Sequence, residues 1–172
     1  MARIALYTFG VLKGRYDSDE MTEFYKAAPS VYASLGSAEG FIAQAGDSRP
    51  GPRRQPAVGD DYGAWGVLDI PRFFDRFDPA VCSPIQTLSL WHDWRSAKAF
   101  SYGALHRTYL VRRAEWFQPA DWPGYVLWWV GDDQIPQWCE GAERLDGLAD
   151  KGPTTSGFNF ARIFDEAGRP QS

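Results

Sequence analysis

The sequence is poor in the residues that usually build metal sites or covalent frameworks. Its 172 residues include two cysteines, Cys82 and Cys139, and two histidines, His92 and His106. The cysteines lie far apart and outside CxxC spacing, so neither a zinc knuckle nor a disulfide framework is indicated. Two histidines and scattered carboxylates do not form a metal-binding pattern. We therefore expect no metal ion.

Several longer patterns are missing as well. No apolar run approaches the ~20 residues that cross a bilayer, and residues 1–14 lack the segments of a secretion signal. Neither GxGxxG nor GxxxxGK occurs, which disfavours nucleotide-dependent chemistry. The formal net charge is −4 and the pI about 5.2, so no basic field attracts a phosphate backbone. We expect a cytoplasmic protein with no membrane and no nucleic-acid partner.

Aromatic residues, in contrast, make up 16% of the chain. Such a surplus suits a large core, a subunit interface or a pocket lined with rings. The length predicts one domain over residues 1–172. Within it, residues 47–84 begin with a stretch rich in proline, glycine and charge, which predicts an inserted loop. This insertion is either a lid over a pocket or an interface arm.

Apolar periodicity predicts two β-α-β units followed by a helix and a last strand. The predicted strands are residues 3–12, 41–46, 85–92, 125–131 and 158–164, and the predicted helices are residues 21–37, 96–117 (with Ser96 as N-cap) and 135–152. This order predicts an α+β, ferredoxin-like antiparallel sheet with helices on one face. The other face must be buried, and a homodimer packed sheet against sheet is the common solution.

The helix predicted over residues 96–117 carries a polar and aromatic stripe. Three- and four-residue steps align Ala99, Tyr102, His106, Tyr109, Arg113 and Trp116 on one face. His106 could move a proton at neutral pH, Tyr102 or Tyr109 could orient a substrate, and Arg113 could hold an enolate or carboxylate. The alternative is that His106 packs on the two tyrosines and that Arg113 is a solvated charge.

His92 is a second candidate catalytic residue. It ends the strand 85–92 beside Asp93, and this pair could serve as an oriented base. The alternative reading is a strand-end residue followed by a turn former. We interpret Trp91, Trp116, Trp128 and Trp129 as core or interface residues.

The run LSLWHDWRSAKAFSYGALHRTYLVRRAEWF, followed by YVLWWV, ERLDGLADKGPT and FNFARIF, resembles a bacterial family known only as domain of unknown function 3291. The opening strand and DSDEMTEFYKAAPSVYASLGSAEGFIAQ also fit, so the resemblance covers about residues 1–46 and 85–164. That family is similar to the dimeric α+β barrel superfamily of cofactor-free monooxygenases, polyketide cyclases, muconolactone isomerases and some haem enzymes. The resemblance implies the fold and the dimer and leaves the chemistry open.

We therefore hypothesise a biosynthetic enzyme of secondary-metabolite type that needs no cofactor. It would oxygenate, cyclise or isomerise an apolar polycyclic or polyketide-like small molecule, with His106 as acid or base. A first alternative, implied by the resemblance, is a haem enzyme of the aldoxime-dehydratase kind with His106 as axial ligand. A second alternative is a non-catalytic ligand-binding dimer.

Overall fold

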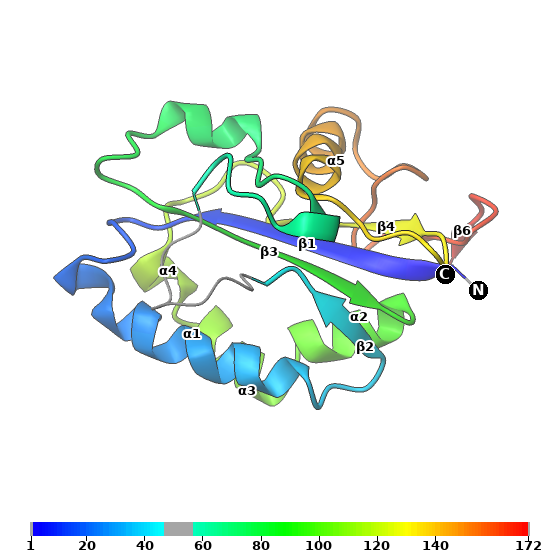
Figure 1. Cartoon of the computed structure of the whole chain (residues 1–172), viewed down its shortest axis with the longest axis horizontal. Helices are drawn as coiled ribbons and strands as arrows, with labels where there is room; N and C mark the ends of the chain where they lie inside the picture. The colour runs from blue at the N-terminus through cyan, green and yellow to red at the C-terminus, as the bar shows by residue number, and fades with distance from the viewer. Residues whose placement is uncertain (1, 47–56, 172) are drawn as a thin grey trace.

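A computed structural model describes residues 2–46 and 57–171 and shows one four-stranded antiparallel sheet (Figure 1). Its strands, in the order β2-β3-β1-β4 across the sheet, are β1 (Arg3–Val11), β2 (Phe41–Gln44), β3 (Pro84–Trp91) and β4 (Tyr125–Val130). All four overlap residue ranges that the sequence predicts as strands. The α+β class and the antiparallel sheet are thus confirmed.

Strand β1 is the centre of the sheet, because it pairs with β3 on one side and β4 on the other. Its side chains alternate between two buried layers, as the period of a strand requires. Ile4 and Leu6 belong to one apolar cluster, whereas Ala5, Tyr7 and Phe9 belong to another. Both faces of the sheet are therefore covered.

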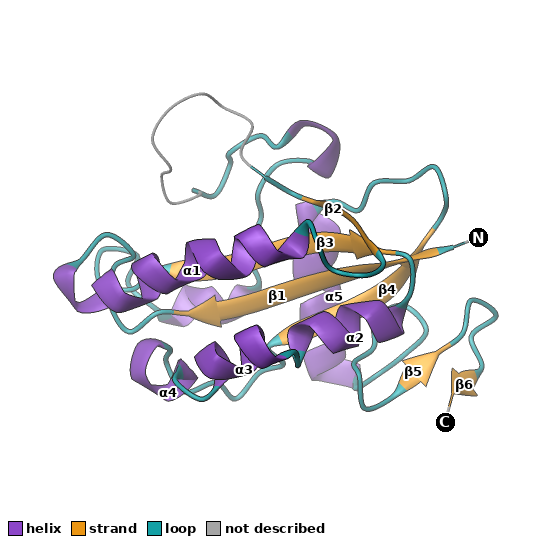
Figure 2. Ribbon diagram, turned by 90° about the horizontal axis from the view of Figure 1, so that it is seen from below, coloured by secondary structure: helices purple, strands orange, loops and turns teal. Residues whose placement is uncertain are grey.

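Helices lie on both faces of the sheet, so the prediction of helices on one face is wrong. The helices are α1 (Thr22–Leu35), α2 (Trp94–Ser101), α3 (Ala104–Leu110), α4 (Arg113–Trp116) and α5 (Trp138–Lys151). Figures 1 and 2 show α1 to α4 on one face and α5 on the other. None of the helices in the described residues is long and apolar enough to cross a membrane.

The face that carries α5 is also covered by the described part of the insertion, residues 57–83. Leu68 and Phe73 join the cluster that α5 forms with Tyr7 and Val126. This segment contains two 3₁₀ turns, Gly63–Trp65 and Arg72–Arg76. Arg72 pairs with Asp150 of α5, and Arg76 pairs with Asp121 at 2.9 Å. The homodimer was predicted because one sheet face was expected to be bare. The chain itself covers that face with α5 and residues 57–83.

The single helix predicted over residues 96–117 is three short helices. Its start is Trp94, and the N-cap is Asp93 rather than Ser96. The first helix ends at Ser101, and Gly103 follows its C-cap, Tyr102, whose φ of −110° lies outside the helical range. Glycine is a weak helix former. In addition, the hydroxyl of Ser101 donates a hydrogen bond of 2.8 Å to the carbonyl of Ala97, and such bonds compete with the regular helix. The three- and four-residue alignment therefore fails across residues 102–103.

The C-terminal segment differs from the predicted strand 158–164. Phe158 makes an isolated bridge with Leu127 of β4, through two backbone hydrogen bonds of 2.8 and 2.9 Å. The regular strand is limited to β5 (Ile163–Phe164), which pairs with β6 (Pro170–Gln171) in a separate hairpin. Residues after 152 therefore extend past the edge of the sheet without adding a full fifth strand.

The contact of α5 with β1 gives a first prediction. A Cβ built on Gly141 would lie 2.6 Å from the Tyr7 ring, which is fully buried, whereas a Cβ on Gly147 of the same helix meets nothing within 4 Å. Gly141→Ala should lower the free energy of unfolding by about 1–3 kcal/mol through overpacking. Gly147→Ala should raise it by about 0.5–1 kcal/mol, because alanine favours the helix.

Urea denaturation of both variants measures the difference. Equal free energies of unfolding for the two variants would contradict the close packing of α5 on β1.

Candidate functional site

A cleft of about 210 Å³ lies between α1 and the junction of α2 and α3, on the face opposite to the insertion. Its lining residues are mostly small or apolar: Val31, Ser34, Ala38, Phe100, Gly103, Ala104 and His106. The hydroxyl of Ser34 donates to the carbonyl of Val31 at 2.7 Å, so its proton is already engaged. Among the described residues of this lining, His106 is the one titratable side chain.

His106 is half-buried on α3, and its environment suppresses the charged form. Its ring meets the Phe100 ring edge to face, with centroids 5.5 Å apart. Burial lowers the pKa of His106 below its ordinary value. Its Nδ1 is buried and, among the described residues, has no hydrogen-bond partner. A neutral imidazole nitrogen in an apolar wall can accept a proton from a ligand that brings one, or can bind a ligand hydroxyl.

Phe100 fixes one wall of the cleft. Its ring also packs on Trp91 of β3, with centroids 5.4 Å apart. The Trp91 indole is itself anchored, because its Nε1 donates to the Ser89 hydroxyl at 2.9 Å. The wall beside His106 is thus connected to the fully buried core of the sheet, which holds the ring in place.

Tyr102 does not join His106, although both lie on the predicted stripe. The Tyr102 ring packs on Phe160, with centroids 5.9 Å apart, and its hydroxyl shares a hydrogen bond with Tyr125. Burial, together with this hydrogen bond, raises the pKa of Tyr125. The helix is interrupted at Tyr102 and Gly103, so Tyr102 and His106 do not share one continuous helical face. Tyr102 therefore supports the C-terminal segment and does not line the cleft.

Of the other residues on the predicted stripe, Arg113 lies apart from the cleft. Arg113 lies exposed on the short helix α4 and is not among the residues that line the cleft. The side chain of Tyr109 lies outside the described part of the structure. Of the predicted group, Tyr102 and Arg113 therefore lie apart from His106, and Tyr109 stays a prediction.

His92 and Asp93 do not form an oriented base. The Asp93 carboxylate accepts hydrogen bonds from the backbone N–H groups of Arg95 and Ser96, at 2.7 and 2.9 Å, and caps α2. Burial raises the pKa of Asp93, but these hydrogen bonds outweigh it and hold the pKa below its usual value. His92 is exposed at the strand end. This arrangement agrees with the alternative reading of a strand end and a turn former.

Sequence reasoning missed the residues that shape the cleft opposite His106. Ser34 and Ala38 come from the C-terminal part of α1 and the turn after it, far from His106 in sequence. The small side chains of this stretch could have indicated the cleft, because small residues leave space between two packed helices. In residues 2–46 and 57–171, no group of three or more His, Cys, Asp or Glu side chains is placed to hold a metal ion.

Comparison with known proteins gives one match. A family model described as "Domain of unknown function (DUF3291)" matches residues 3–172. No curated protein and no solved structure matches the chain.

The buried imidazole gives a second prediction, on pH dependence. An unfolded histidine has a pKa of about 6.5, and burial lowers the pKa of His106 in the folded chain, so folding favours the neutral ring. The resulting stability is present above about pH 6.5 and should be lost as the pH falls toward the folded pKa. Urea denaturation between about pH 5 and 8 should show this loss, and His106→Gln should reduce it.

NMR titration gives an independent reading, because the chain has two histidines. In His92→Gln, the one remaining imidazole should titrate below ~6.5. A His106 resonance that titrates above that value would contradict the desolvated environment.

Proposed function

Because the chain belongs to a family described only as a domain of unknown function (DUF3291), we propose its function from the site itself. We propose that the chain is an acid–base enzyme for a small, largely apolar molecule with an acidic C–H or O–H group. The substrate would lie in the cleft between α1 and α3, and His106 would move the proton.

The observation that carries this proposal is the buried Nδ1 of His106, which lacks a partner among the described residues in a mostly apolar wall. A buried polar atom without a partner costs free energy, about 1–3 kcal/mol, unless a bound group satisfies it. A ligand O–H, or a polarised C–H, would relieve this cost. The lowered pKa keeps the imidazole neutral at pH 7, which is the form that can accept a proton.

The elementary step is one proton transfer. A neutral imidazole nitrogen takes a proton from the carbon next to a carbonyl, or from a phenol oxygen, and leaves an enolate or phenolate and an imidazolium. The imidazolium then returns the proton to the same or to another atom of the substrate. Isomerisation and cyclisation can both proceed through this step, and the electrons and protons balance without a further reactant.

The volume of the cleft limits the size of the expected substrate. A volume of about 210 Å³ is below the roughly 300–1,000 Å³ of sites for drug-sized ligands. The proposal therefore replaces the polycyclic substrate expected from the sequence with a molecule of about one ring. The same volume bears on haem, the alternative cofactor.

Haem does not fit the described cleft. A tetrapyrrole is larger than the ligands that a space of about 210 Å³ accepts. A ligating histidine also normally donates its second ring N–H to an acceptor, whereas Nδ1 of His106 has no partner among the described residues. We therefore propose the reaction without this group.

The placement in the dimeric α+β barrel superfamily is also a proposal. The strand order β2-β3-β1-β4, with a helical connection after β1 and another after β3, supports a ferredoxin-like connectivity. A homodimer would have to use the outer strand β2 or the helices, since both sheet faces are covered.

A cytoplasmic location stays a prediction.

A non-catalytic binding role is the second candidate. One observation favours it: the described lining has one titratable group, and Tyr102 and Arg113 are not part of that lining. This candidate predicts binding of small apolar molecules without any proton transfer.

A third prediction distinguishes the acid–base enzyme from the non-catalytic binding protein. It measures hydrogen–deuterium exchange at the CH₂ group of phenylacetone in D₂O by ¹H NMR. Phenylacetone has one aromatic ring and an acidic CH₂ group. The wild-type chain should accelerate loss of the CH₂ signal, and His106→Ala should reduce the acceleration by about 10²–10⁴. Imidazole added to the buffer should restore part of the rate in this variant, because the base then comes from solution.

His92→Ala is the matched control and should exchange like wild type, since His92 lies exposed outside the cleft. Binding of phenylacetone without exchange in the wild type would favour the non-catalytic candidate. No binding and no exchange would reject both.

A fourth prediction locates the ligand. Ala104 lines the cleft, whereas Ala99, also an exposed alanine of this helical region, does not. Ala104→Leu should fill the cleft and weaken phenylacetone binding at least about tenfold, because steric exclusion removes the contact surface. Ala99→Leu should bind like wild type. Titrations followed by ¹H–¹⁵N NMR measure both affinities, and equal weakening would place the ligand elsewhere.

A further inference from the structure

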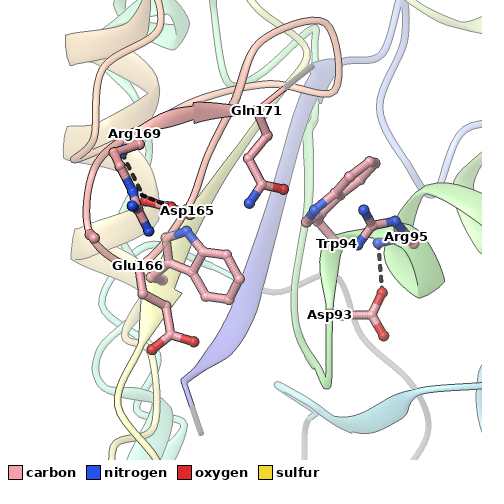
Figure 3. A pocket seen from close by; sticks show the side chains of 9 residues that line it. Asp93, Trp94, Arg95, Asp165, Glu166, Arg169 and Gln171 are labelled. Atoms are coloured by element: carbon pink, nitrogen blue, oxygen red, sulfur yellow. Dashed lines mark hydrogen bonds and ion pairs between the residues drawn. The ribbon is translucent and has the colours of Figure 1, made fainter.

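A second hollow, of about 290 Å³, lies at the start of α2 (Figure 3), whereas His106 follows the other end of that helix. It is formed by the start of α2, by Trp129 of β4 and by the β5–β6 hairpin. It shares no lining residue with the His106 cleft. Because α2 has eight residues, its two ends are about 12 Å apart. The hollow is therefore a separate candidate site.

Two indole rings, those of Trp94 and Trp129, line this hollow. Trp129 is held by a hydrogen bond from its Nε1 to the carbonyl of Phe164, at 2.7 Å. Trp94 comes from the first turn of α2, and the Arg95 guanidinium lies 4.5 Å from the centre of its ring. Trp129 is half-buried and lines the hollow, so a ligand can reach it. An oriented indole offers a rigid apolar surface at little cost in entropy.

Some of the charged groups in the hollow are already satisfied. Asp165 accepts from the Nε of Arg169 at 2.9 Å, and Asp93 caps α2. Within the described residues, the side chains of Glu166 and Gln171 have no hydrogen bond, and Figure 3 shows the Gln171 amide pointing into the hollow on the side of Trp94. The side-chain groups that can still form hydrogen bonds with a ligand are thus the acceptor oxygens of Glu166, the amide of Gln171, and the N–H donors of Arg95.

This combination selects a class of ligand. Both signs of charge lie within the lining, so a strongly charged ligand would meet a like charge on one side. A hydroxyl group can donate and accept, and therefore matches a mixed set of free donors and acceptors. An oriented indole suits the C–H face of a saturated ring. These features together describe a neutral sugar ring.

We propose that this hollow binds a neutral hexose-type sugar ring, stacked on Trp129, with Glu166 accepting from its hydroxyls and with Arg95 and Gln171 donating to them. The site is independent of the proton-transfer site at His106. The open, shallow form of the hollow predicts a Kd on the order of 1–10 mM for one ring.

The test is titration of the full chain with D-glucose, D-galactose, D-mannose and N-acetyl-D-glucosamine, each to about 50 mM, followed by ¹H–¹⁵N NMR of the tryptophan indoles. At least one sugar should shift the Trp129 Nε1 signal. Glu166→Ala and Gln171→Ala, both at exposed positions, should each weaken binding about fivefold or more, and Trp129→Ala should abolish it. His106→Ala should bind the sugar like wild type.

Three results would overturn the proposal: no sugar shifts an indole signal of the wild type, or Glu166→Ala and Gln171→Ala both bind like wild type, or glucose 6-phosphate or glucosamine binds more than tenfold tighter than glucose. The last result would show a charged ligand. The two surface variants keep the test valid if Trp129→Ala fails to fold.

Discussion

Burial of both faces of β1 is the constraint on which the other layers depend. Ile4 and Leu6 pack toward α1 and α2, whereas Tyr7 and Phe9 pack toward α5 and residues 57–83. Because a one-residue slip would exchange these two sets, the register of β1 with β3 and β4 fixes which segment covers which face. The close approach of α5 at Gly141, against the Tyr7 ring, belongs to the same constraint.

This arrangement also places the two candidate sites. The His106 cleft lies on the helical face opposite to the insertion, so the insertion is not a lid over that cleft in its described part, residues 57–83. The indole hollow lies at the other end of α2, where β4 and the C-terminal hairpin meet it. A single short helix thus separates an apolar site with one proton acceptor from a polar site with two flat rings.

Local patterns in the sequence were sufficient for most of the fold. The alternating apolar residues of 3–12 predict β1, and the apolar stretches 85–92 and 125–131 predict β3 and β4. The apolar steps at Trp138, Leu145 and Leu148 predict α5. A helical stripe shows that a helix packs, but it does not show on which face of a sheet. For this reason the sequence predicts α5 and not its position, and the dimer was inferred from a face that α5 and residues 57–83 cover.

The site was less predictable for a similar reason. His106 is recognisable as a titratable residue among aromatics, but its neighbours were chosen by assuming one continuous helix. Gly103 costs a helix only about 1 kcal/mol relative to alanine, so the sequence alone does not decide whether the helix breaks there. The break moves Tyr102 to Phe160 and Tyr125 and leaves His106 facing residues of α1. Such pairings between distant segments depend on tertiary packing.

The most direct measurement of the central claim is a crystal structure of the chain with phenylacetone bound. The account predicts the ligand in the cleft between α1 and α3, with its carbonyl or CH₂ group within about 3.2 Å of a ring nitrogen of His106. A ligand bound elsewhere, or a cleft closed by its own side chains with His106 paired to the protein, would contradict it.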